Sequence, residues 1–231
     1  MYQLDPRTAG FGGMTSEWEA PPQRRPQCPP FRLECDAGCP PLPANRCRAI
    51  VCRAALDAIS LAANAAAALE ATPPAPETVR LFRAFFGHPP SRPVPWAGNR
   101  PSGQTVAHRF RRCAQELAGG RTVTYRCVTN CPATRNAVTN AALEPSVIRL
   151  CPRFFNRPAG QPLGNQFFRG GVVLHEMLHL LYHQFFHHPG HPSGDPERRR
   201  DNAHCYEAFA LRVAGHAAEP QDVAACRNRP A

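Results

Sequence analysis

The sequence predicts an α+β fold that is mostly helical and contains a small β-sheet. Five segments place apolar residues at helical spacing, and two short segments, 121–128 and 146–155, are rich in β-branched residues and typical of strands. The chain has 231 residues, of which 43% are hydrophobic and 19% charged. This length and composition are sufficient for one domain with its own core.

The N-terminal part differs in composition from the rest. Residues 1–44 are rich in Pro and Gly, so we expect an extended, poorly packed arm pinned by its cysteines, followed by one domain over residues 45–231. Asn45 is a plausible N-cap for a long Ala-rich helix that ends before Pro73. We expect the buried stripe of this helix to contain Ile50, Leu56, Ile59 and Leu69.

Four further helices are expected in the remaining chain. Segment 77–86 ends at Gly87, a natural C′ residue, and segment 105–118 ends at Gly119-Gly120. An apolar helix begins after Gly170-Gly171 and continues to about residue 186, and the last helix covers 202–215. The strand candidate at 146–155 is closed by Pro152.

The charge of the chain does not indicate a nucleic-acid partner. The formal net charge is +10, and all 27 basic residues are Arg. A basic protein can bind nucleic acid, but these arginines are scattered, and the absence of Lys with abundant Ala and Pro is typical of a GC-rich genome. No run of 18 apolar residues is present, so we expect no membrane span.

Eleven cysteines favour disulfides and therefore an exported, extracellular protein. Their odd number leaves at least one thiol without an intramolecular partner. The first residues lack the charged and apolar regions of a secretion signal, so the export route is not visible, and a cytoplasmic location is the alternative.

The motif His175-Glu176-Met177-Leu178-His179 predicts a metal site. Residues four apart lie on one face of a helix, so His175 and His179 can bind one Zn²⁺ per chain. Glu176 is placed to act as a general base toward a water molecule activated by the metal, which is the chemistry of peptide hydrolysis. The simpler alternative is a solvated polar stripe on an ordinary core helix.

Zinc needs a third protein ligand, and several downstream residues are candidates. His204 and Glu207 share one face of the last helix, which would lie opposite the two histidines if the helices cross. The full set of candidates is His183, His187, His188, His191, Asp195, Asp201, His204 and Glu207.

The stretch "VIRLCPRFFNRPAG…GNQFFRGGVVLHEMLH", the preceding "TYRCVTNC" and the following "DNAHCYEAFA" resemble the aspzincins, the deuterolysin and peptidyl-Lys metalloendopeptidase family. The resemblance implies a secreted zinc metalloendopeptidase with a zincin-like fold, disulfides and an HExxH active-site helix. It implies that His175 and His179 are ligands and that Glu176 is the base. It also places Tyr206 and Glu207 at the pocket for a protein or peptide substrate.

One departure from that family concerns the third ligand. The family's Asp lies in a "GTxDxxYG" turn that is absent here, and Asp195 is its nearest equivalent. Because His204 replaces the Asp of the family's "NAD" triplet, we favour His204 as third ligand, followed by Asp195 and Glu207. Two alternatives remain open: a disulfide-stapled binding module with a structural metal, and an effector or toxin protease exported by a dedicated device.

Overall fold

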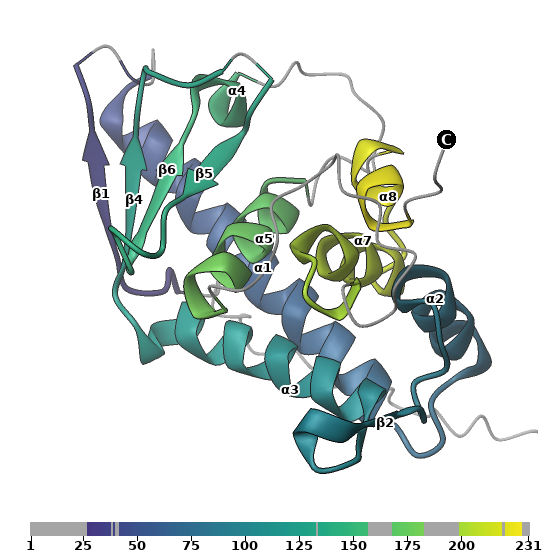
Figure 1. The fold of residues 1–231 in the computed structure, drawn as a ribbon. Helices are drawn as coiled ribbons and strands as arrows, with labels where there is room; N and C mark the ends of the chain where they lie inside the picture. Colours follow the sequence, from purple (N-terminus) through teal and green to yellow (C-terminus); the bar gives the residue numbers. More distant parts are fainter. Residues whose placement is uncertain are drawn as a thin grey trace, which may run out of the picture.

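The computed structural model describes residues 27–37, 39, 42–132, 134–156, 168–182, 199–218 and 220–227. Within these ranges the fold is α+β, as predicted. Helices surround the long helix α1 (Ala44–Glu70), and a four-stranded sheet lies at one end of it (Figure 1).

Helix α1 is the centre of the core, and it packs against α3 (Ser102–Gln115), α5 (Phe168–Leu181) and α7 (Ala203–Val213). Its buried face differs from the predicted stripe. Of the predicted residues only Leu69 is buried, and Ile50, Leu56 and Ile59 are half-buried. The other buried positions are mostly alanines, together with Val51 and Leu61. Small side chains on this face let the neighbouring helices approach closely, which a stripe of large residues would prevent.

Only the N-terminal end of α1 differs from the prediction. The helix begins at Ala44 with Pro43 at the N-cap position, so the prediction of Asn45 as N-cap is wrong. Asn45 instead lies inside the helix, in its first turn. Its side chain accepts a hydrogen bond from the backbone N–H of Arg46. The helix ends at Glu70, before Pro73 as predicted.

By length and composition α1 is the one described helix that could cross a membrane. Half of its apolar window is buried inside the structure, against the three helices named above. A core helix meets the same length and composition criteria, so the finding is weak evidence for a membrane span.

Helix α2 (Pro76–Phe86) ends at Gly87, whose φ of 76° gives the predicted left-handed C-cap. A two-stranded pair, β2 (Pro93–Val94) and β3 (Arg100–Pro101), flanks the short 3-10 helix η1 (Pro95–Ala97). Helix α3 continues into the π-helical turn η2 (Glu116–Gly120), so it ends at the predicted Gly pair.

The main sheet has the strand order β1-β4-β6-β5. Strands β1 (Phe31–Cys35), β4 (Val123–Cys127) and β6 (Val147–Leu150) run parallel, and β5 (Ala137–Thr139) pairs antiparallel with β6 at the edge. Strand β1 lies in the segment expected to be a poorly packed arm. Its Phe31 side chain is buried against Tyr125 of β4, which offsets the cost of ordering a Pro-rich neighbourhood. Residues 1–26 lie outside the described ranges.

Three disulfides join these elements: Cys28–Cys52, Cys131–Cys151 and Cys205–Cys226. The last one links α7 to α8 (Pro220–Arg227), a helix that was not predicted. The segment predicted as one strand over 146–155 is strand β6 followed by the short helix α4 (Pro152–Phe155). Disulfides are typical of proteins in oxidising surroundings, so these three fit an extracellular location.

Candidate metal centre

Helix α5 brings the HExxH residues into the core between α1 and α7. It begins at Phe168, so the prediction that it starts after Gly170-Gly171 is wrong and both glycines lie inside it. A Cβ at Gly170 would lie 2.7 Å from Cβ of Asp57 on α1. A Cβ at Gly171 would lie 2.8 Å from Oε1 of Glu207 on α7. The glycines are therefore contact surfaces that let α5 approach both neighbours.

The two histidines of the motif converge, as their spacing predicts. His175 and His179 are 7% and 4% exposed, and their Nε2 atoms lie 3.2 Å apart. Their ring centroids are separated by 4.9 Å. The two imidazoles are thus buried, with their Nε2 atoms facing each other, and they do not form a solvated stripe.

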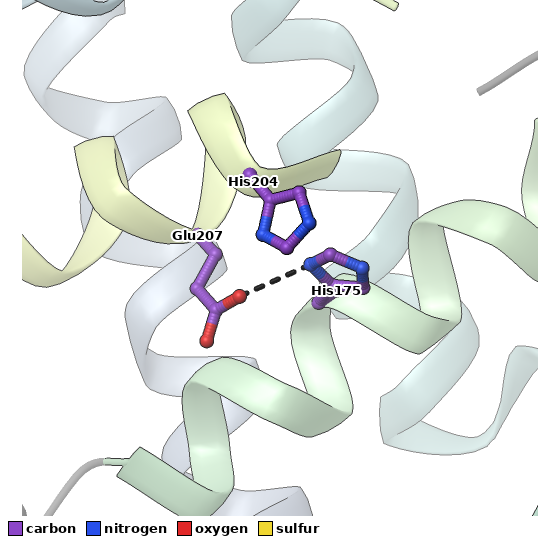
Figure 2. Close-up of side chains that lie close together, drawn as sticks. All are labelled: His175, His204 and Glu207. Carbon is purple, nitrogen blue, oxygen red and sulfur yellow. Dashed lines mark hydrogen bonds and ion pairs between the residues drawn. The ribbon is translucent and has the colours of Figure 1, made fainter. Parts of the chain in front are cut away.

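Helix α7 supplies two more groups to the same place. Its N-cap is Asn202, whose side chain accepts a hydrogen bond of 3.0 Å from the backbone N–H of His204. Glu207, one turn further, is 3% exposed, and its Oε2 lies 3.0 Å from Nδ1 of His175. The His204 ring stands edge-on to the His175 ring at 4.4 Å between centroids (Figure 2).

These contacts define a donor cluster. His175, His204 and Glu207 each offer one ligand atom, and these atoms all lie within 4.8 Å of one another, so the group could hold a metal ion. Figure 2 shows the two α7 side chains directed at the His175 ring from the facing helix. Two helices that are far apart in the chain must therefore pack correctly before the donors meet.

Glu176 lies in the same region but has different surroundings. It is 4% exposed, and its Oε2 accepts a hydrogen bond of 2.6 Å from Oγ1 of Thr139 on the edge strand β5. Burial raises the pKa of Glu176 to about 7, while the Thr139 hydrogen bond and the charges of His204 and Arg135 act in the opposite direction. The carboxyl group is therefore held near the sheet edge rather than in solvent.

Behind the cluster, Tyr206 anchors α7. Its ring packs against Phe86 and Phe110 at centroid distances of 5.3 and 5.0 Å. Its hydroxyl accepts a hydrogen bond of 3.0 Å from Arg109, whose Nη1 also donates to Asp201 at 2.9 Å. Burial raises the pKa of Tyr206 to about 12, so the hydroxyl keeps its proton at neutral pH. Tyr206 is thus a packing residue, not a group that lines an open pocket.

The structure brings His175, Glu176, His179, His204 and Glu207 into one region. Asp201 pairs with Arg109 instead, and the candidates His183, His187, His188, His191 and Asp195 lie outside the described residues. Sequence reasoning missed Thr139, because a strand of three residues gives no periodic signal.

Comparison with known proteins does not assign a family. No family model matches the sequence, and no curated protein matches it significantly. Inference about the function therefore depends on the geometry of this site.

Proposed function

We propose that the protein is a zinc metallopeptidase in which His175, His179 and His204 hold the metal. The supporting observation is the distance of 3.2 Å between the Nε2 atoms of His175 and His179. Two nitrogens bound to tetrahedral Zn²⁺ at 2.0–2.1 Å would lie about 3.3 Å apart. The two imidazoles are therefore already spaced for one zinc ion.

The donor chemistry also fits zinc. Imidazole nitrogens suit this borderline-soft ion, and three histidines would leave one tetrahedral position for water or substrate. His204 is better placed as the third ligand than Glu207, because the Oε2 atom of Glu207 already contacts Nδ1 of His175. When bound, zinc would act as a Lewis acid toward water and the peptide carbonyl.

Glu207 has an orienting role in this proposal. With a proton on Nδ1, His175 donates a hydrogen bond to the Glu207 carboxylate, which leaves the lone pair of Nε2 for the metal. A carboxylate that is 3% exposed and engaged with an imidazole is poorly placed to bind a substrate side chain. We therefore replace the substrate-binding role expected for Glu207 with this one.

Glu176 is the proposed general base. Its Oε2 is engaged by Thr139, which orients the carboxylate and leaves Oε1 for a water molecule. Glu176 accepts a proton from the attacking water and later delivers it to the leaving amine. Hydrolysis of peptide bonds in protein or peptide substrates follows, in line with the aspzincin resemblance of the sequence and with the zincin-like fold that it implies.

The test is the substitution Glu176→Gln in the full chain. We expect hydrolysis of a denatured protein substrate to fall by about 10²–10⁴-fold, while elemental analysis still finds one zinc per chain. Glu77→Gln, which changes an exposed carboxylate on α2, is the matched control and should retain full activity. Undiminished activity in Glu176→Gln, or folded wild-type protein that binds no zinc, would refute the proposal.

A structural metal is the second candidate, because His175, His204 and Glu207 have ligand atoms that all lie within 4.8 Å of one another, and His179 contacts His175. If Glu207 joined the three histidines as a ligand, coordination would be closed, and the protein would be a binding module stapled by disulfides. Zinc-loaded protein that cleaves no substrate and keeps its zinc tightly would favour this candidate.

A further inference from the structure

A second group of reactive side chains lies outside the candidate metal centre, at one end of the sheet. Five of the cysteines are outside the three disulfides: Cys35, Cys39, Cys47, Cys113 and Cys127. Four of them come together. Cys35 and Cys127 are the last residues of β1 and β4, Cys39 follows β1, and Cys47 lies in the first turn of α1.

The strand register places Cys35 beside Cys127. The two residues are paired in the parallel β1–β4 ladder, directly after the pair Glu34 and Arg126. Paired residues of parallel strands project to the same face, and neighbouring strands are about 4.8 Å apart, within the Cα separation of disulfides. The backbone N–H of Asp36, the residue after Cys35, donates to the carbonyl of Cys127 at 3.0 Å, which holds the two strand ends together.

Cys39 and Cys47 form the other half of the cluster. The backbone N–H of Cys39 donates to the carbonyl of Asp36 at 3.0 Å, which turns the chain back after β1. Both side chains are buried, at 4% and 0% exposure. Burial raises the pKa of the Cys39 thiol, and the nearby groups Cys35, Asp36 and Cys47 raise it further. The turn keeps Cys39 next to the end of β1, and Cys47 at the start of α1 is the remaining thiol of the four.

We propose that these four thiols close two additional disulfides, Cys35–Cys127 and Cys39–Cys47. Each bond forms when two thiols give two protons and two electrons to a small disulfide such as oxidised glutathione, whose S–S bond breaks to yield two thiols. The oxidised chain then has five disulfides, which use ten of the eleven cysteines. Cys113, fully buried on α3, is the remaining thiol and explains the odd number.

Disulfide formation fits the cluster better than metal binding. A tetrahedral zinc site with four thiolates would place its sulfurs about 3.8 Å apart. Among the described residues, three or more donor atoms lie within 4.8 Å of one another in the His175 cluster. The four thiols do not form a second group of this kind. Two separate pairs satisfy the geometry without this requirement.

The additional bonds would fasten the N-terminal strand covalently. Strand β1 has five residues and lies at the edge of the sheet, where its non-covalent contacts with β4 are the ladder, the Phe31–Tyr125 packing and the Glu34–Arg126 ion pair. One proposed bond joins its end to β4, and the other joins the following turn to α1. With Cys28–Cys52, which also ends on α1, β1 would be anchored on both sides.

The experiment is a disulfide map of the full chain, folded in a buffer of oxidised and reduced glutathione, then denatured, alkylated without reduction and digested. We expect one alkylated cysteine per chain, Cys113, and linked peptides that contain Cys35–Cys127 and Cys39–Cys47. Alkylation of all five free thiols would overturn the proposal. So would linkage of Cys35 to Cys39, or a zinc ion released from these thiols by a mercurial reagent.

Variants give a second measurement. The double variant Cys35→Ser/Cys127→Ser should lose one link, keep the Cys39–Cys47 link and unfold at lower denaturant concentration than wild type. Cys113→Ser is the control, and its map should show all five links and no alkylated cysteine. If the double variant does not fold, the map of the wild-type chain still decides between the outcomes.

Discussion

The contact between Glu207 and His175 gives the most discriminating prediction, because it separates an orienting carboxylate from a ligand. Glu207→Gln keeps the size of the side chain and removes its charge. The contact is 3.0 Å long, and the two side chains are 4% and 8% exposed. A hydrogen bond to a charged group at such a site contributes about 1.5–3 kcal/mol. That equals roughly a 10–100-fold loss of zinc affinity, the range known for carboxylates behind metal-bound histidines.

The assay is competition for zinc between the folded variant and a chromophoric chelator, with circular dichroism to confirm folding. Loss of a direct ligand should be more damaging, so we expect His204→Ala to bind zinc more weakly than Glu207→Gln. Asp57→Asn changes another buried carboxylate, which pairs with Arg53 at 3.0 Å, and should leave zinc affinity unchanged. If Glu207→Gln loses zinc completely while His204→Ala retains it, Glu207 is the ligand and our assignment is wrong.

Three further predictions follow from other contacts. Gly171→Ala should displace Glu207, because the new Cβ would lie 2.8 Å from its Oε1. We expect weaker zinc binding and a free energy of unfolding lower by about 1–3 kcal/mol in chemical denaturation. If both values are unchanged, the close approach is contradicted. Thr139→Val removes the hydrogen bond to Glu176 and should lower kcat without loss of zinc. Thr139→Ser keeps a hydroxyl and should have nearly the wild-type kcat. Equal kcat in both variants would show that the hydroxyl has no positioning role. Burial lowers the pKa of His88 from 6.5 to about 4, so the unfolded chain takes up a proton at higher pH than the folded chain. This group should lower the free energy of unfolding by up to about 3 kcal/mol as the pH decreases from 6.5 to 4. His88→Gln should remove this contribution in denaturation curves measured across that range.

The parts of the fold that were predictable have local signals. Gly87 ends α2 and the Gly119-Gly120 pair ends η2, because these turns need backbone conformations that glycine readily adopts. Pro73 likewise marks the end of α1. Strands β1 and β5 were missed because one follows a Pro-rich segment and the other has three residues.

The candidate site was predictable only in part, for the same physical reason. The spacing of His175 and His179 follows from helix geometry alone, so their convergence could be derived from the sequence. The contact of Glu207 with His175 depends on how α7 crosses α5, which no local pattern determines. Thr139 reaches Glu176 from a strand of the sheet, so its role depends on long-range packing in the same way.

The Gly170-Gly171 pair has a consequence for tracing the ancestry of this chain. The two positions exclude a side chain for separate reasons, since Gly170 faces α1 and Gly171 faces α7. If the proposed catalysis were lost by mutational drift, Glu176 would be free to vary, but the helices would still have to fit together. Glycine should therefore persist at both positions in descendants with or without that activity, and this pair would be the more durable marker of common descent.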